Sequence, residues 1–489
     1  MVSTRYGGDP GQGQPIGDQA MTAPVLVENR TYDEIEIGES ASLSRTITQD
    51  DIELFAAVSG DANPTHFDEA FARGAQLDGI VAHGMLTAGL ISNLLGNKLP
   101  GPGAVYCSQE LNFADPVRVG DTIDVTVTVK EKLPERRLLL DCRCVNQAGV
   151  TVLAGTATLI APAEKLSIRQ HALPRLSVSR HRHYDRLIEH TKGIPAVPCA
   201  VAHPCDESAL TAVVDAFKAE MIVPILVGPT AKIRGVAEAA GLDLAGLEIV
   251  DAPHSHAAAT QAVALVRAGK AELLMKGSLH TDELMGAVVA KDTGLRTARR
   301  ISHVFLMDVP TYPEPLFITD AAVNIFPDLA TKADIVQNAI DLHLGLGLGT
   351  PRIAILSAME TVNPKVQGTL DAAALCKMAD RGQIKGGVLD GPLAMDNAIS
   401  VEAARIKGIV SPVAGRAQIL VAPDLEAGNM LAKNLSFLSN ADAAGIVLGA
   451  RVPIILTSRA DAVRTRMASC AVAALYAHSL RQSLTLAAE

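Results

Sequence analysis

Residues 59–66 read Ser-Gly-Asp-Ala-Asn-Pro-Thr-His, and residues 79–85 read Gly-Ile-Val-Ala-His-Gly-Met. Asp61 and His66 flank an Asn-Pro pair, which is a turn signal, so we expect the chain to bend there and to aim both side chains into one pocket. Gly84 opens an apolar run in which leucine recurs at every fourth position, a period that predicts a buried helix. Its N–H would lie at the positive end of that helix, where it can hold a carbonyl oxygen as negative charge develops.

The residues that follow predict an antiparallel sheet around this helix, which we place at residues 84–97. Residues 121–129 carry Ile or Val at every second position, as in a strand with one buried face. Residues 138–145 and 152–160 are two further strand-like runs, and Gly149 lies between them, as the turn of a hairpin requires.

The motif Ser-Gly-Asp-x-Asn-Pro-x-His, followed by Ile-Val-x-His-Gly-Met and, at residues 111–121, by Leu-Asn-Phe-x-x-Pro-Val-x-Val-Gly-Asp, resembles the MaoC-like, (R)-specific enoyl-CoA hydratases. The resemblance covers about residues 33–160. It implies an α+β hot-dog domain, in which an antiparallel sheet wraps around a long central helix, and which usually works as a dimer.

By this resemblance, Asp61 and His66 would activate or orient a water that adds across the double bond of a trans-2-enoyl-CoA. The N–H of Gly84 would polarise the thioester carbonyl. Asn63 and Ser92 would contact the substrate, with Ser92 facing the acyl pocket. A histidine at position 83 would be structural, because the catalytic histidine of the family matches His66.

Residue types alone leave other interpretations open. Ser59 and Asp61 also suit a turn, and His66 suits a solvated loop. Ser92 could bond back to the preceding turn of its helix. A hot-dog domain can also be a thioesterase, which would hydrolyse saturated acyl-CoA.

Length and composition predict more than this one domain. The 489 residues predict two or three domains. A net charge of −10 argues against nucleic acid or an anionic membrane as the main partner. No apolar stretch reaches the ~18 residues that span a membrane, and the N-terminus lacks a basic-then-apolar signal, so we expect a cytoplasmic protein.

The seven cysteines include no Cys-x-x-Cys pair and are typical of buried thiols in a reducing compartment. Cys199 and Cys205 bracket Ala-His-Pro, but without a second matching pair they favour a strand and a loop over a zinc site. We therefore predict no metal site.

Composition and periodicity divide the chain into four segments. Residues 1–23, rich in Gly, Gln and Pro, read as a flexible lead, and residues 24–160 form the hot-dog domain. Residues 161–187, with three basic residues in a row at 181–183, read as a linker. From residue 188 to 489, apolar runs alternate with helical patterns, which predicts a parallel sheet covered on both faces.

Ligands of such sheets bind at the carboxyl ends of the strands. Small polar segments follow five of the predicted strands, at residues 276–278, 319–320, 390–392, 423–424 and 458–461. We expect phosphate and CoA there. Ser458 precedes a helical stretch over residues 460–477, and therefore suits both a helix N-cap and an anion site.

Five segments of this half resemble the phosphate acetyl/butyryltransferase family over about residues 190–485. They are Leu-Val-Gly-Pro-Thr-Ala-Lys-Ile at 226–233, Ile-Thr-Asp-Ala-Ala-Val-Asn at 318–324, Asp-Gly-Pro-Leu-Ala-Met-Asp at 390–396, Pro-Asp-Leu-Glu-Ala-Gly-Asn at 423–429 and Leu-Thr-Ser-Arg-Ala-Asp at 456–461. The resemblance implies acyl transfer between CoA and inorganic phosphate, in the cleft between two α/β subdomains related to isocitrate and isopropylmalate dehydrogenases. CoA thioesters and phosphate would be substrates, and no tightly bound cofactor would be needed.

The resemblance also implies roles for single residues. Arg459 would hold phosphate or acyl phosphate, and Ser458 would bond the transition state. Further substrate-binding positions would be Asp320, Asn324, Asp390 and Asn429, although Asp320 and Asp390 suit a turn or a cap equally well.

One position departs from the family pattern. The acetyltransferases carry an acid in the helix after the Ser-Arg pair, and the matching residue here is Thr465. The proton acceptor of this half is therefore unassigned, because Asp461 lies closer to the serine than the family's acid does.

The sequence thus predicts a bifunctional enzyme of acyl-CoA metabolism, a hydratase joined to a phosphate acetyltransferase or butyryltransferase, assembled as a homo-oligomer. Two alternatives concern the second half. It could be a catalytically weak module for CoA binding or oligomerisation. It could also be a dehydrogenase, although the glycine run at residues 345–349 lacks the strand that a Rossmann fingerprint needs before it.

Overall fold

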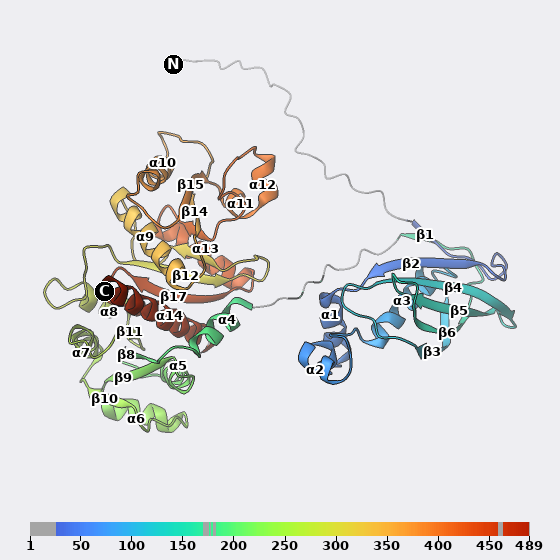
Figure 1. Ribbon diagram of the computed structural model, residues 1–489, viewed down its shortest axis with the longest axis horizontal. Helices are drawn as coiled ribbons and strands as arrows, with labels where there is room; N and C mark the ends of the chain where they lie inside the picture. Colours follow the sequence, from blue (N-terminus) through green and yellow to red (C-terminus); the bar gives the residue numbers. More distant parts are fainter. Residues whose placement is uncertain (1–25, 170–175, 177, 179–181, 458–462, 489) are drawn as a thin grey trace, which may run out of the picture. The chain divides into compact units, whose positions relative to one another are not determined.

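The computed structural model of the protein describes residues 26–169, 176, 178, 182–457 and 463–488, so the expectation for residues 1–23 lies outside it. The chain divides into two compact units, Met1–Val178 and Ser179–Glu489 (Figure 1). None of the helices in the described part is both long and apolar enough to cross a membrane.

The first unit holds a five-stranded antiparallel sheet in the order β2-β4-β5-β6-β3. Its strands are β2 (Ser40–Thr46), β3 (Val105–Phe113), β4 (Thr122–Leu133), β5 (Arg137–Val145) and β6 (Thr151–Ile160). Its helices are α1 (Gln49–Ser59), the short 3-10 helix η1 (Pro64–His66), α2 (Glu69–Gly74) and α3 (Gly84–Asn97). The central helix α3 packs on β2 and β4, as expected for a hot-dog domain.

Local periodicity predicted this core well. The helix expected over residues 84–97 is confirmed as α3. The alternating Ile and Val residues of β4 are at most 1% exposed, and they share one hydrophobic core with Ile91 and Leu94 of α3. Gly149, with a φ of +77°, occupies the turn between β5 and β6.

The predicted linker over residues 161–187 is too long at both ends. In the first unit, β7 (Ser167–Arg169) pairs with β1 (Leu26–Glu28). In the second, Arg182–Thr191 form α4, where Tyr184 is fully buried and its hydroxyl donates to the Leu306 carbonyl over 2.9 Å. The many polar and basic residues of this segment obscured its helical period in the sequence. In the structure α4 packs against β12 and α14.

The second unit is built on an eleven-stranded sheet, in the order β10-β9-β8-β11-β18-β17-β12-β13-β16-β14-β15. One block of parallel strands comprises β8 (Val197–Ala202), β9 (Ile222–Gly228), β10 (Glu248–Asp251), β11 (Leu273–Lys276) and β18 (Ile454–Ile455). A second comprises β13 (Leu316–Thr319), β14 (Arg352–Leu356), β15 (Val388–Leu393) and β16 (Ile419–Val421). The strands β17 (Asp442–Leu448) and β12 (Ser302–Asp308) join the two blocks.

The expectation of a parallel sheet needs correction, because the joining strands are antiparallel to their neighbours. The pairs β18–β17, β17–β12 and β12–β13 are all antiparallel. Three reversals make the two blocks run in opposite directions. The last residues of β18 and β13 nevertheless lie level in the sheet, because Ile455 and Thr319 pair with Ile446 and Val304, which pair with each other. The carboxyl ends of the two blocks therefore meet at the joining strands. Fully buried strands are apolar whichever way they run, so the sequence alone does not reveal this reversal.

Helices cover both faces of this sheet (Figure 1). They are α5 (Glu207–Lys218), α6 (Thr230–Ala239), α7 (Ser255–Arg267), α8 (Thr281–Val289), α9 (Leu329–Gly345), α10 (Gln367–Asp380), α11 (Met395–Ile399), α12 (Val401–Ile406), α13 (Leu425–Leu438) and α14 (Val463–Ala488). The last of these, α14, contacts β17, β18 and β11 as well as α4, α5 and α9, so it ties the two blocks together.

Candidate active sites

In the first unit, the loop between α1 and η1 is bent by two successive side-chain turns. The carboxylate of Asp61 accepts from the N–H of Asn63 over 3.2 Å, and the side-chain oxygen of Asn63 accepts from the N–H of Thr65, also over 3.2 Å. This is the bend that the Asn-Pro pair predicts. Asn63, expected to contact substrate, lies exposed and caps η1.

The ring of His66 is buried at the end of η1 and is held by the backbone. Its Nδ1 lies 2.7 Å from the carbonyl oxygen of Val81. Because a carbonyl oxygen only accepts, Nδ1 carries the hydrogen, and Nε2 of the neutral ring has a lone pair that can take a proton. The backbone of Val81 thus sets His66 in the tautomer that a general base needs.

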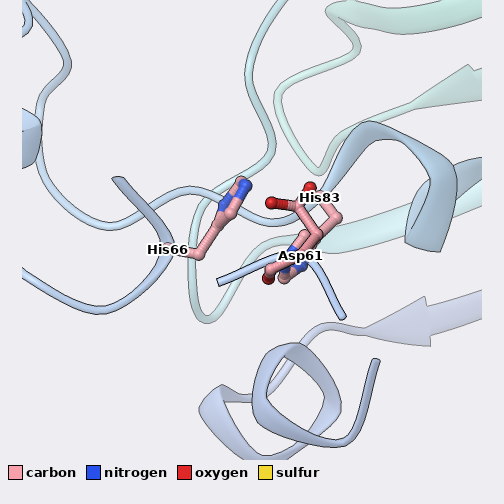
Figure 2. A group of neighbouring side chains, drawn as sticks. All are labelled: Asp61, His66 and His83. Carbon is pink, nitrogen blue, oxygen red and sulfur yellow. The ribbon is translucent and has the colours of Figure 1, made fainter. Parts of the chain in front are cut away.

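His83, expected to be structural, lies inside the same cluster (Figure 2). Its ring stacks on that of His66, with centroids 3.7 Å apart. Its Nε2 donates to the backbone carbonyl of Asp61 over 3.0 Å, and its Nδ1 is buried with no hydrogen-bond partner in the described part of the chain. Ligand-type atoms of Asp61, His66 and His83 lie within 4.8 Å of one another. Sequence reasoning assigned catalytic roles to two members of this cluster and a structural role to the third, and only the fold shows that residue 83 lies against residue 66.

The start of α3 adjoins this cluster, since His83 is the N-cap of the helix and Gly84 its first residue. N–H groups of a first helical turn have no partner within the helix, and they attract negative charge. A Cβ on Gly84 would lie 2.8 Å from the ring of Phe113. Ser92, expected to face the acyl pocket, lies on the exposed side of α3.

Gly84→Ala should lower the rate of enoyl-CoA hydration by about tenfold, because small displacements of a catalytic donor are costly. The added methyl group must push aside the ring of Phe113 or shift the helix start by a few tenths of an ångström. The matched control is Gly74→Ala, at the end of α2, where a Cβ meets nothing within 4 Å. Equal rates for both variants would contradict a role for the N–H of Gly84.

In the second unit, a cavity of about 700 Å³ lies over the strands where the two blocks join. The residues that line it include Lys276 at the end of β11, His303 of β12, Asn429 and Lys433 of α13, and Thr457 after β18. Thr457 directly precedes Ser458 and Arg459, which lie outside the described residues together with Asp461. Thr465, which stands where the family has an acid, lines the cavity as well.

The four other residues expected to bind substrate occupy different places. The buried carboxylate of Asp320 accepts from the N–H groups of residues 322, 323 and 324 and from the side-chain amide of Asn324, which is the turn role that the sequence left open. Asn429 donates to the Ala321 carbonyl over 3.0 Å and lines the cavity. Asp390 lies on the edge strand β15, separated from the joining strands by β14, β16 and β13.

His303 is a cavity residue that sequence reasoning missed. It is 1% exposed, and its Nδ1 has no hydrogen-bond partner in the described part of the chain. Burial lowers the pKa of His303 to about 4, against the opposing charge of Asp320. The sequence feature that could have pointed to His303 is that it is the one titratable residue in the apolar run Ile-Ser-His-Val-Phe-Leu-Met, which begins at residue 301.

Comparison with known proteins assigns each unit to a family. Residues 254–474 match the family model described as phosphate acetyl/butaryl transferase, and residues 33–138 match the model described as MaoC like domain. A phosphate acetyltransferase of Rhizobium meliloti is 70% identical over 294 residues, which make up 60% of this chain and 93% of that relative.

Solved structures resemble each unit. A branched-chain phosphotransacylase from Enterococcus faecalis V583 is 30% identical, and the match covers 58% of this chain and 99% of that chain with a TM-score of 0.51. An unliganded R-hydratase from Pseudomonas aeruginosa is 45% identical, and the match covers 32% of this chain and 99% of that chain with a TM-score of 0.31. The second unit therefore has the α/β fold of a phosphotransacylase. The chain belongs to the phosphate acetyl/butyryltransferase family and carries a MaoC-like domain ahead of its transferase domain.

Proposed function

We propose that the protein is a bifunctional enzyme, which hydrates trans-2-enoyl-CoA to (R)-3-hydroxyacyl-CoA and transfers an acyl group between CoA and inorganic phosphate. The observation that carries the hydratase activity is the cluster of Asp61 and His66 at the glycine-led start of α3, within a MaoC-like domain. The observation that carries the transferase activity is the 70% identity to a phosphate acetyltransferase, which covers 93% of that relative.

Hydration needs a base for water and a donor for the thioester oxygen. Nε2 of His66 and the carboxylate of Asp61 hold a water and take one of its protons while its oxygen bonds to C3 of the enoyl group. The electron pair of the double bond moves towards the thioester carbonyl, whose oxygen accepts from the N–H of Gly84. The proton then passes to C2, so that the elements of one water are added and both side chains are restored.

The same three residues could be suspected of holding a metal ion, but their geometry favours proton transfer. An ion bound to an imidazole lies in the plane of the ring, on the axis of the lone pair. The rings of His66 and His83 are stacked with only 29° between their planes, so their lone pairs lie side by side and do not converge. We expect hydration to be unchanged after dialysis against EDTA.

In the transferase domain, the cavity offers Lys276 and Lys433 as positive charges for phosphate or CoA. We propose that Arg459 holds the phosphate and that Ser458 bonds the tetrahedral transition state, since both follow Thr457 at the cavity wall. The near relative is named a phosphate acetyltransferase, which favours acetyl as the acyl group. Butyryl or branched acyl groups are the second candidates, because the family model and the similar solved structure are described by those names.

Arg459→Ala should lower phosphate-dependent release of CoA from acetyl-CoA by about 10- to 100-fold, since hydrogen bonds to charged groups contribute about 1.5–3 kcal/mol. Most of the loss should appear as a higher KM for phosphate. Lys365→Ala, an exposed change away from the cavity lining, is the control. An unchanged KM and kcat would contradict the assignment of Arg459.

The choice of substrate and reaction can be tested on the unaltered protein. Crotonyl-CoA should lose its enoyl absorbance, and saturated acyl-CoA should release CoA only when phosphate is present. Release without phosphate would favour a thioesterase. No release with acetyl-CoA, butyryl-CoA or isobutyryl-CoA would favour a transferase domain that only binds CoA or assembles the protein.

We also propose that the protein is a cytoplasmic homo-oligomer whose hot-dog domains pair. The edge strand β3 exposes Val105, Tyr106 and Phe113, and unpaired apolar edges invite another strand. Phe113 adjoins Gly84, so pairing there would also cover the hydratase site. We further propose that the two strand blocks of the second unit correspond to the two α/β subdomains that the resemblance implies, which are related in fold to isocitrate and isopropylmalate dehydrogenases. Light scattering after size exclusion should give at least a dimer.

A further inference from the structure

We propose that His303 is the proton acceptor of the transferase site and takes the place of the acid that the family carries at position 465. This inference rests on the proposed acyl transfer. A proton must move between phosphate and the CoA thiol in this cavity, and no described residue of its lining carries a carboxylate.

The described residues that line the cavity include neither aspartate nor glutamate. Their titratable groups are Lys276, His280, His303 and Lys433. A lysine ammonium has three donors and no lone pair, and Lys276 donates to the Thr457 carbonyl over 3.3 Å. His280 lies exposed in the loop before α8. His303 is the neutral base within the buried part of the lining.

The packing around His303 leaves its Nδ1 unused. The ring stands edge-on to Phe305, with centroids 4.3 Å apart, and a Cβ on Gly445 would come within 3.1 Å of its Nε2. The glycine thus makes room for the imidazole beside β17. A buried ring nitrogen without a partner costs free energy, and such groups in native structures need an explanation. Exchange of a proton between this imidazole and a substrate in the cavity that it lines is the explanation that we adopt.

The charges around the ring of His303 are compatible with a base that is neutral at rest and positively charged only while it holds a proton during turnover. Asp320 is 3% exposed and favours the imidazolium, whereas Lys276, Lys433 and a protonated His280 oppose it. In the absence of substrate, burial lowers the pKa of His303 to about 4, so the ring is neutral and ready to accept. Binding of a phosphate dianion adds negative charge and raises the basicity of the ring at that moment.

The proton balance is as follows in the direction of acyl phosphate formation. An oxygen of hydrogen phosphate bonds to the carbonyl carbon of acyl-CoA, and its proton passes to His303. The bond between carbon and sulfur breaks, and the sulfur leaves with the electron pair. The imidazolium gives its proton to that thiolate, so the products are acyl phosphate and CoA thiol, and His303 is neutral again. The reverse direction uses the same steps.

The test is His303→Gln in the full chain, assayed with acetyl phosphate and CoA between about pH 6 and pH 9. We expect kcat at pH 7 to fall by about 100-fold, with the KM values within about threefold. Because the variant depends on preformed thiolate, its kcat should rise by about tenfold per pH unit below the thiol pKa of about 8.5, while that of the wild type stays nearly level. Imidazole added to His303→Ala should restore part of the rate.

Two controls show that the chain is intact. Hydration of crotonyl-CoA by the same variant should be unchanged, and His256→Gln, on the exposed surface of α7, should keep the wild-type rates. A kcat of His303→Gln within threefold of wild type would overturn the proposal. A loss that is equal at every pH and not relieved by imidazole would also overturn it, because a packing role has that signature. A wild type without phosphate-dependent activity would overturn the proposed acyl transfer itself.

Discussion

Replacing Asp61 by asparagine should lower the rate of crotonyl-CoA hydration by about 10³-fold, because a positioned acid or base contributes about 10²- to 10⁴-fold. Asparagine has the same shape, and its side-chain oxygen can still accept from the N–H of Asn63, so the loop should keep its bend. The bond from His83 goes to the backbone carbonyl of residue 61, which the substitution leaves in place. The change therefore removes the negative charge and little else.

The matched control is Asp68→Asn. Asp68 is an exposed acid just after η1, and it caps α2 by accepting from the N–H of Phe71 over 3.0 Å. Asparagine caps helices as well as aspartate does, so hydration should stay within about twofold. Release of CoA from acetyl-CoA by phosphate should be unchanged in both variants, since the two activities reside in different units. Persistent hydration by Asp61→Asn would remove Asp61 from the site.

Lys332→Met should destabilise the transferase domain by about 3–5 kcal/mol, because it leaves the carboxylate of Asp371 buried without its partner. The ammonium of Lys332 on α9 lies 2.7 Å from the carboxylate of Asp371 on α10, and both side chains are at most 7% exposed. Gln367 donates to the other carboxylate oxygen over 2.8 Å, which does not replace the lost charge. Urea unfolding followed by circular dichroism should show an earlier transition for this domain.

Two further variants make this test specific. Lys377→Met removes an exposed pair with Asp380, so the unfolding free energy should change by less than about 1 kcal/mol. Lys332→Met combined with Asp371→Leu should recover most of the stability, since an apolar pair of similar volume is often as stable as a buried ion pair. If Lys332→Met alone unfolds like wild type, water must reach the carboxylate and the pair is not buried in solution.

Local patterns predicted most of the elements that position the two sites. The strand period of β4 and the helix period of α3 arise from hydrogen bonds and side-chain directions within a few residues, which the sequence contains directly. The Asn-Pro bend after Asp61 is also local, and the structure has it. The catalytic roles of Asp61, His66, Ser458 and Arg459 rest on motif order and stay predictions.

Only the tertiary structure decided which residues meet. His83 joins His66 because the backbone of Val81 bonds to Thr65 and to the ring of His66. His303 and Thr465 line one cavity because β12 pairs with β17, on which α14 packs. Strand direction and pairing depend on contacts between residues distant in the sequence, and a buried apolar run is compatible with either direction. The sequence by itself therefore determined the two domains, their families and the bend at Asp61, whereas burial and long-range pairing decided the reversal of the sheet and the position of the candidate base.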